Sequence, residues 1–142
     1  MTDFSSPGLM PISAVTGDPV ARVPIEATVV DVARAMVNCD VGALVIGGDA
    51  RPAALVSERD IVRAVAAGRD PATTLASSVA STNLVWCDAE ASVDQVGARM
   101  MERYIRHVLV ERDGALAGIV SARDLLGVYS VGAPDDEDFG SA

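Results

Sequence analysis

Residues 118–126 read Gly-Ile-Val-Ser-Ala-Arg-Asp-Leu-Leu, and residues 54–62 read Ala-Leu-Val-Ser-Glu-Arg-Asp-Ile-Val. In both stretches an apolar run ends at a Ser, which is followed by one variable residue, an Arg, an Asp and two more apolar residues. A Ser with an Asp three residues later can form a capping box, so each stretch predicts a strand that passes directly into a helix. The offset of 64 residues between the two copies indicates an internal repeat.

The repeat extends well beyond these two stretches. Residues 13–66 align with residues 77–130 without a gap, and 13 of the 54 aligned positions are identical. Chance pairing in a chain this rich in Ala and Val would give roughly five identities. We therefore interpret the chain as a duplication of one folding unit of about 50 residues.

Both copies predict the same first half of the unit, a strand followed by a helix. The strand is expected at residues 20–23 and 84–87, and the helix is expected to open with a capping box at Thr28 and at Ser92. Each helix has an apolar stripe at i, i+3, i+4, i+7 and i+8, which predicts one face packed on a sheet. The stripes are Val29, Val32, Ala33, Met36 and Val37 in the first copy and Val93, Val96, Gly97, Met100 and Met101 in the second.

Two more strands and a second helix complete the predicted β-α-β-β-α unit. These strands are expected at residues 43–46, 53–56, 108–110 and 117–120. The glycines of residues 47–49 and 112–114 tolerate the positive φ of tight hairpins, and the second helix is expected to open at Ser57 and Ser121. One unit is too small to bury both of its helices, so we expect an α/β fold of the α+β type in which two units share one interface.

The pattern divides the chain into five segments. They are a flexible N-terminus (1–11), a first unit (12–67), a linker (68–76), a second unit (77–130) and an acidic disordered tail (131–142). Gly68 is expected to stop the preceding helix, and Asp70-Pro71 and Thr74 are expected to start short linker helices.

Charge and composition exclude several classes of function. The net charge is −9, and the 11 basic residues, all Arg, are scattered, which argues against a nucleic-acid binder. No apolar run approaches the ~20 residues of a membrane span, and the first residues lack the features of a secretory leader. Cys39 and Cys87 lack metal-type spacing, and His107 is the only His. We expect a cytoplasmic protein with reduced cysteines and no metal site.

Residues 118–126 resemble the signature of cystathionine-β-synthase (CBS) domains, which is a small residue, two apolar residues, Ser or Thr, two variable residues, Asp and an apolar residue. The first copy departs from it only in having Ala54 where Gly is common. Residues 105–110, Ile-Arg-His-Val-Leu-Val, resemble the basic pair that precedes an apolar strand in this family. Residues 15–20 resemble the segment that leads into the first strand, so the resemblance covers about residues 12–130.

The resemblance implies a stand-alone tandem CBS pair with pseudo-twofold symmetry and two clefts between the repeats. Many such pairs bind AMP, ADP, ATP or S-adenosylmethionine there, and many form homodimers. It therefore implies a ligand-sensing regulatory module with no covalently bound cofactor, acting on a partner that the sequence does not identify. The sequence has no activated Cys and no glycine-rich phosphate loop, so we expect no enzyme activity.

The residues themselves suit an adenosine ligand. Ser57 and Ser121 are expected at helix N-termini, where free N–H groups favour an anion, and Asp60 and Asp124 could accept hydrogen bonds from a ribose diol. The resemblance assigns them the same roles. The other candidate binding residues are Arg59, Arg123, Arg106, His107, Val20, Leu84 and Trp86. The alternative is that both Ser-x-x-Asp motifs are capping boxes that need no ligand.

We expect the two clefts to be unequal. Arg106 and His107 align with Gly42-Ala43, so the first copy lacks this basic pair, which we expect to hold phosphate beside either Asp60 or Asp124. Alternatively, Arg106 pairs with Glu102 and His107 is an ordinary strand-edge residue.

Two further alternatives stay open at this point. Trp86 aligns with Arg22 on the first strand, which borders the adenine pocket in the family. It could instead be a half-buried strand residue or a dimer contact. The alternative function is a dimeric docking or structural module with degenerate clefts that acts without a ligand.

Overall fold

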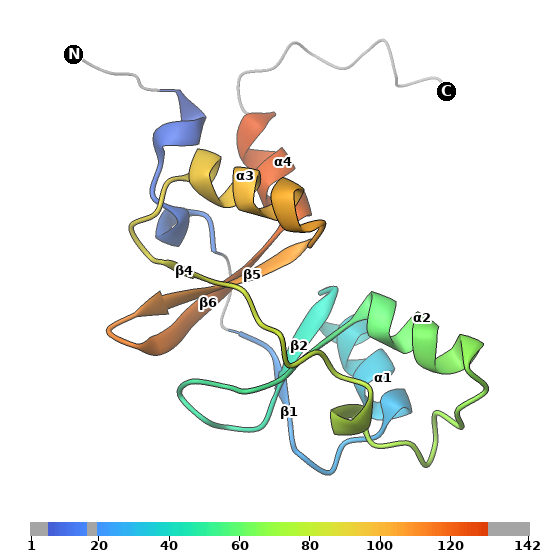
Figure 1. Cartoon of the computed structure of the whole chain (residues 1–142). Helices are drawn as coiled ribbons and strands as arrows, with labels where there is room; N and C mark the ends of the chain where they lie inside the picture. Colours follow the sequence, from blue (N-terminus) through green and yellow to red (C-terminus); the bar gives the residue numbers. More distant parts are fainter. Residues whose placement is uncertain (1–5, 17–19, 131–142) are drawn as a thin grey trace, which may run out of the picture.

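The computed structural model describes residues 6–16 and 20–130; residues 1–5 and 17–19 and the predicted tail at 131–142 lie outside the described part. The chain folds into two lobes of helix and sheet (Figure 1), in the predicted β-α-β-β-α order repeated twice. The first unit consists of β1 (Arg22–Val23), α1 (Val29–Cys39), β2 (Ala43–Ile46), β3 (Leu55–Ser57) and α2 (Glu58–Ala66). The second consists of β4 (Trp86–Asp88), α3 (Val93–Arg103), β5 (His107–Arg112), β6 (Ala115–Ser121) and α4 (Ala122–Tyr129). Three short 3-10 helices are η1 (Pro7–Leu9), η2 (Ile12–Ala14) and η3 (Ala76–Ser78).

Each unit has its own three-stranded sheet with the same topology. The order is β1-β2-β3 in the first unit and β4-β5-β6 in the second. The middle strand pairs in parallel with the first strand, because α1 or α3 crosses back over the sheet, and antiparallel with the third strand, which follows directly. The matching topologies confirm the duplication that the sequence predicts.

The predicted capping boxes fix where the helices begin. Thr28 caps α1 and Ser92 caps α3, each with reciprocal hydrogen bonds to the third helical residue. The apolar stripes are narrower than the sequence suggests. Met36 and Met100 are buried, whereas Val37 and Met101, at the end of each stripe, are each 80% exposed. The last stripe position therefore lies outside the face that packs on the sheet.

The segments that precede each unit are exchanged between the units. Ile12 is fully buried in the core of the second unit, and Ala76 is 1% exposed in the core of the first. The Ile12 N–H donates to the carbonyl of Ala91 at 2.7 Å, and the Ala76 N–H donates to the carbonyl of Ala27 at 2.9 Å. Both partners of the second bond lie 64 residues from those of the first, so the exchange follows the repeat.

A third apolar cluster joins the two units. It contains Ala43, Val45 and Leu55 from the first sheet and Leu109 from the second, all buried. The two units therefore share one interface, as expected, and neither sheet is covered by its own helices alone.

The β2–β3 connection differs from the expected tight hairpin. It spans residues 47–54 and reaches across to the second unit, where the Leu116 N–H donates to the Ala50 carbonyl at 2.8 Å. The β3 strand therefore begins at Leu55, later than expected. The β5–β6 connection is the predicted tight turn, with positive φ at Asp113 and Gly114.

The start of the chain packs on the second unit. Residues 7–9, which the sequence assigned to a flexible N-terminus, form η1 against α3 and α4. At Gly8 a Cβ atom would clash with the Asp94 carboxylate, so a larger residue there would displace the Asp94 side chain. No helix in the described part of the chain combines the length and apolar character needed to cross a bilayer.

Candidate functional site

Ser57 and Asp60 are held together at the start of α2. Because β3 ends at Ser57 and α2 begins at the next residue, the Ser57 side chain lies at the free N–H groups of the helix. The Ser57 N–H donates to Asp60 Oδ2 at 2.9 Å, and the Asp60 N–H donates to Ser57 Oγ at 3.2 Å. Ser121 and Asp124 form the same pair at 2.8 and 3.0 Å. Both motifs are therefore capping boxes, and each box uses only one of the two carboxylate oxygens of its Asp.

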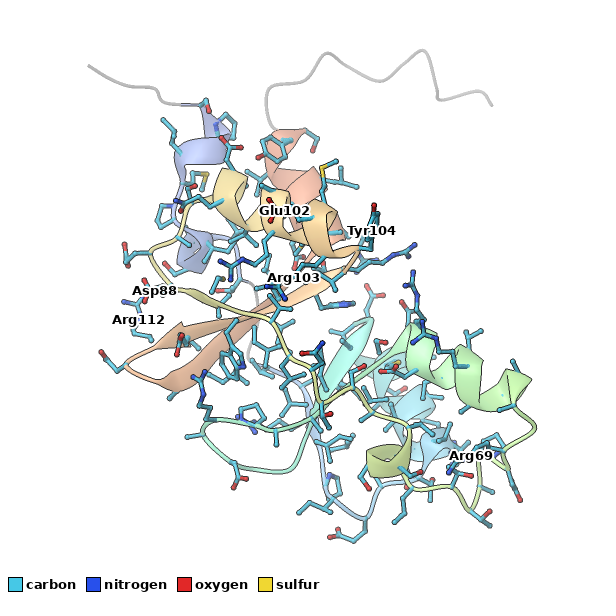
Figure 2. All side chains as sticks on the ribbon, in the orientation of Figure 1. Arg69, Asp88, Glu102, Arg103, Tyr104 and Arg112 are labelled. Carbon is cyan, nitrogen blue, oxygen red and sulfur yellow. The ribbon has the colours of Figure 1, made fainter. Side chains whose placement is uncertain are left out.

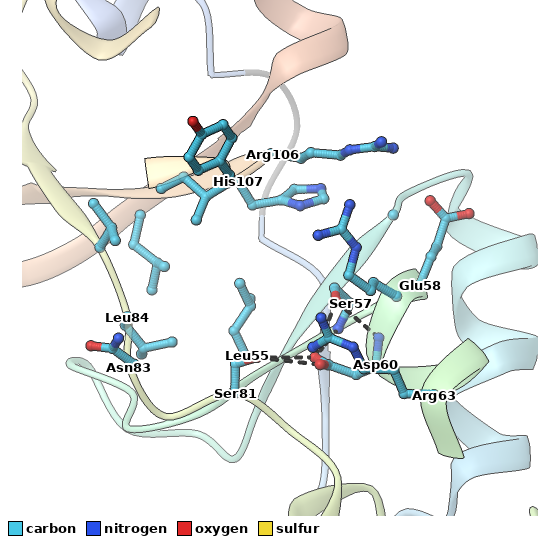
Figure 3. Close-up of a pocket in the computed structure, with 16 residues that line it drawn as sticks. Leu55, Ser57, Glu58, Asp60, Arg63, Ser81, Asn83, Leu84, Arg106 and His107 are labelled. Atoms are coloured by element: carbon cyan, nitrogen blue, oxygen red, sulfur yellow. Dashed lines mark hydrogen bonds between the residues drawn. The ribbon is translucent and has the colours of Figure 1, made fainter. Parts of the chain in front are cut away.

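A cavity of about 310 Å³ opens beside the first of these boxes. We call it the inter-unit cavity, because Ser57 and Asp60 of the first unit form one wall and Arg106 and His107 of the second unit lie opposite them (Figure 3). The remaining lining residues are Gly42, Leu55, Glu58, Arg59, Arg63, Ser81, Asn83, Leu84, Val85, Tyr104, Ile105 and Leu109. The structure thus brings six of the predicted site residues to one place: Ser57, Arg59, Asp60, Leu84, Arg106 and His107.

Asp60 is the one buried charged side chain among the described residues, at 6% exposure. It is stabilised by hydroxyl groups: Ser57 Oγ donates to Oδ2 at 3.1 Å, and Ser81 Oγ lies 3.3 Å from both carboxylate oxygens. Ser81 was missed by the sequence reasoning. It aligns with Gly17 in the repeat, so the motif comparison gave no signal for a hydroxyl group at this position.

Three arginines line the inter-unit cavity: Arg59, Arg63 and Arg106. Arg63 is a second residue that the sequence reasoning missed. Within residues 6–16 and 20–130, the two ion pairs are Arg51–Glu111 and Arg112–Glu90, so no described carboxylate lies within 4 Å of the cavity arginines. The alternative pairing of Arg106 with Glu102 does not form, because α3 ends at residue 103 and Arg106 lies beyond the helix.

His107 is a partly buried group at the start of β5. Burial lowers its pKa below the ordinary value of 6.5; Glu58 and Asp124 oppose this shift, and Arg106 adds to it. Its ring is therefore mainly neutral near pH 7 and can donate one hydrogen bond and accept another. The positive charge of the cavity comes from its arginines.

A second and more open groove adjoins the cavity. It encloses about 670 Å³ between α1 and α4, and we call it the α1–α4 groove. Ser121 and Arg123 line it, together with Arg106 and His107, which it shares with the inter-unit cavity. The basic pair thus lies between the two Ser-x-x-Asp motifs.

Three predicted site residues lie elsewhere. Asp124 and Val20 line neither the inter-unit cavity nor the α1–α4 groove, and Val20 packs against the cluster that joins the units. Trp86 also lines neither of them. Arg51 instead covers its ring, with the guanidinium carbon 4.0 Å from the ring centroid. Trp86 thus takes part in the contact between the 47–54 connection and the second unit.

The described residues contain no cluster of three or more His, Cys, Asp or Glu side chains placed to hold a metal ion. Cys39 is exposed and Cys87 is half-buried. Burial raises the pKa of the Cys87 thiol to about 11, so the thiol stays protonated at neutral pH.

Comparison with known proteins places this arrangement in a family. The CBS domain matches residues 12–67 and again residues 76–131. Hypoxic response protein 1 of Mycobacterium tuberculosis is 37% identical over 100 residues, covering 69% of this chain and 70% of that protein. The crystal structure of Hypoxic Response Protein I with two coordinated zinc ions is 33% identical, with a TM-score of 0.69, and the match covers 82% of this chain and 97% of that one.

A CBS domain protein from Pyrobaculum aerophilum, solved in complex with AMP, is 30% identical to this chain with a TM-score of 0.74. That match covers 86% of this chain and 99% of the other. The two segments that match the CBS domain together span most of the sequence and coincide with the two observed units. The chain therefore belongs to the CBS domain family and carries two copies of the domain in tandem.

Proposed function

We propose that the chain is a regulatory CBS pair that binds an adenosine-containing ligand in the inter-unit cavity and signals to a partner protein. The observation that carries the proposal is the composition of this cavity. It places a buried carboxylate, Asp60, and three arginines without described carboxylate partners around one space of about 310 Å³. The role assigned to the chain is binding rather than catalysis.

Each part of a nucleotide has a suitable counterpart in the cavity. Asp60 Oδ1 takes no part in the capping box and can accept a hydrogen bond from a ribose hydroxyl. The arginines and the free N–H groups of α2 suit a phosphate. Leu84, Val85 and Leu109 provide apolar surface for the base. Recognition thus requires side chains from both units, so a bound ligand would contact both.

The charge of the cavity favours AMP, ADP or ATP over S-adenosylmethionine. The three arginines outnumber the two lining carboxylates, Glu58 and Asp60, and an Arg side chain stays charged at any physiological pH. A sulfonium ligand places its positive charge among these groups, whereas a phosphate neutralises them. The relative from Pyrobaculum aerophilum, which was solved with AMP, supports the same choice.

Calorimetry with AMP tests the proposal. We expect Arg106→Ala to weaken binding tenfold or more, because a lost charge-assisted contact to phosphate is worth about 1.5–3 kcal/mol. Arg112→Ala is the matched control, since Arg112 pairs with Glu90 at the β5–β6 hairpin, away from the cavity (Figure 2). The same affinity for AMP in both variants would contradict the assignment of phosphate to Arg106. Two identical AMP sites in the unmodified chain would contradict the inequality of the clefts.

A second candidate function rests on exposed apolar side chains. Val37, Val62, Met101 and Leu126 are each at least 66% exposed on four different helices. Such surface suits a docking module that acts without a ligand. A thermal-shift panel of adenine nucleotides, S-adenosylmethionine and cyclic dinucleotides separates the two candidates. A ligand at 100 times its dissociation constant stabilises by ~2.7 kcal/mol, whereas a panel without any shift favours docking.

A further inference from the structure

We propose that residues 135–138, Asp-Asp-Glu-Asp, bind the arginines of the inter-unit cavity and the α1–α4 groove when no nucleotide is present. We call these four residues the acidic run. We infer the docking of the acidic run from charge and from chain length. A docked acidic run would compete with the phosphate of a nucleotide, and this consequence rests on the proposed function.

Arginines gather at these two spaces although the chain as a whole is acidic. The chain has 20 acidic residues and 11 arginines, yet four arginines gather around these two adjoining spaces. They are Arg59, Arg63, Arg106 and Arg123. The ion pairs of the described residues use Arg51 and Arg112 instead. Three carboxylates, Asp40, Glu58 and Asp60, also line these spaces, but none of them forms a described ion pair with an arginine. The four guanidinium groups, which cannot lose their charge, therefore remain available to a polyanion.

The acidic run follows α4 closely enough in the sequence to reach these arginines. The α4 helix begins at Ala122, which lines the groove, and ends at Tyr129, so its end lies about 12 Å from its start. Extended backbone spans about 3.3 Å per residue, so Asp135 can lie up to about 16 Å from Ser130 and Asp138 up to about 26 Å. The acidic run is therefore long enough to return along α4 to Arg123 and to continue to Arg106.

The acidic run and the four arginines are complementary in charge and equal in number. Four consecutive acidic side chains match four arginines, and a carboxylate can accept two parallel hydrogen bonds from one guanidinium group. Because the acidic run belongs to the same chain, its effective concentration at the cavity is of mM order. Even weak docking at that concentration competes with a nucleotide. The acidic run would thus raise the nucleotide concentration at which the cavity fills.

Docking can be measured without any nucleotide. In the full chain, a nitroxide label is attached to Gly140→Cys in a background that carries Cys39→Ser and Cys87→Ser, so that the label has one attachment site. We expect selective broadening of the amide signals of residues 57–63 and 105–107. The broadening should disappear in about 0.5 M salt, because salt screens exposed charges. It should also disappear in the neutralised variant D135N/D136N/E137Q/D138N.

Two outcomes of the labelling experiment would overturn docking within one chain. One is broadening that is uniform or unchanged in the neutralised variant. The other is full broadening when the nitroxide and the isotope label are on separate copies, which would assign the contact to a second molecule.

Competition is measured by AMP calorimetry on the same neutralised variant. We expect AMP to bind threefold or more tightly than to the unmodified chain. The matched control neutralises four exposed acidic residues that line neither the cavity nor the groove, so both variants change the net charge of −9 by the same four units. The control substitutions are Glu26→Gln, Asp49→Asn, Glu102→Gln and Asp113→Asn. An equal gain in the control would show a general charge effect and overturn competition. If no variant binds AMP, the proposed function fails, while the broadening experiment still decides docking.

Discussion

Asp60 and Asp124 occupy matching positions in the repeat but have different surroundings. Asp60 is 6% exposed and has the Ser81 hydroxyl beside both of its oxygens. Asp124 is partly exposed, and within the described part of the chain its carboxylate accepts only from the Ser121 N–H. The Ser81 hydroxyl has no counterpart in the sequence of the other copy, where the repeat aligns Gly17 with Ser81. Among the described residues, Asp60 is therefore more buried than Asp124 and accepts more hydrogen bonds.

The single His makes the pH dependence of stability testable at one residue. Burial lowers the pKa of His107 in the folded chain, so the unfolded chain binds a proton at higher pH than the folded chain does. The stability contribution is therefore fully present above the ordinary pKa of 6.5 and is lost as the pH falls below it. Carboxylates titrate mostly below about pH 5. We expect the free energy of unfolding in urea to fall from about pH 7.5 to 5.5, and His107→Gln to remove most of this slope.

An unchanged slope in the Gln variant would contradict this assignment, since no other side chain of the sequence normally titrates in that range. Arg112→Ala, which removes a charge far from His107, should keep the slope of the unmodified chain.

At the scale of elements, the exchanged segment around Ile12 has a measurable role. Ile12 is fully buried among side chains of the second unit, although about 80 residues of sequence separate it from them. We expect Ile12→Ala to lower the free energy of unfolding by about 2–5 kcal/mol, the usual range for truncating a buried Ile. Leu9→Ala, at a side chain 66% exposed in the same segment, should change it by at most about 0.5 kcal/mol. Urea unfolding measures both, and equal losses would show that Ile12 has no special role in the core.

The repeat and the capping boxes are local patterns, which explains why the elements could be predicted from the sequence. Ser57 and Asp60 could be assigned to one site because they are three positions apart in the sequence and lie at the start of one helix. The exchange of Ile12 and Ala76 could not be predicted, because apolar residues in a lead-in segment do not specify which core receives them. Arg63 and Ser81 were missed for a related reason. Neither has an equivalent in the other copy, where Gly127 and Gly17 stand, so the repeat gave no signal.

At the scale of the whole molecule, the exchanged segments and the shared cluster predict one cooperative unfolding transition. Each unit lacks part of its core without the other, since Ile12 and Ala76 are contributed across the repeat. Trp86 lies in the second unit against Arg51 of the first, so its emission reports on their separation. We expect Trp86 emission and far-ultraviolet circular dichroism to change together in urea. Two separate transitions would show that the units fold independently.

The second helix of each unit, α2 or α4, carries exposed apolar side chains that predict a homodimer. Val62 and Val65 of α2 are 66% and 56% exposed, and Leu126 and Tyr129 of α4 are 69% and 46% exposed. Apolar side chains in such number on two helices of a small chain usually meet a partner, and a symmetric dimer is the commonest assembly. We expect light scattering to report a dimer at tens of micromolar and Val62→Glu with Leu126→Glu to yield a monomer. Ile25→Glu, at a side chain 64% exposed outside the helices, should leave the dimer intact. A monomeric unmodified chain at that concentration would remove the homodimer, and a dimer that survives the double substitution would place its interface on other elements.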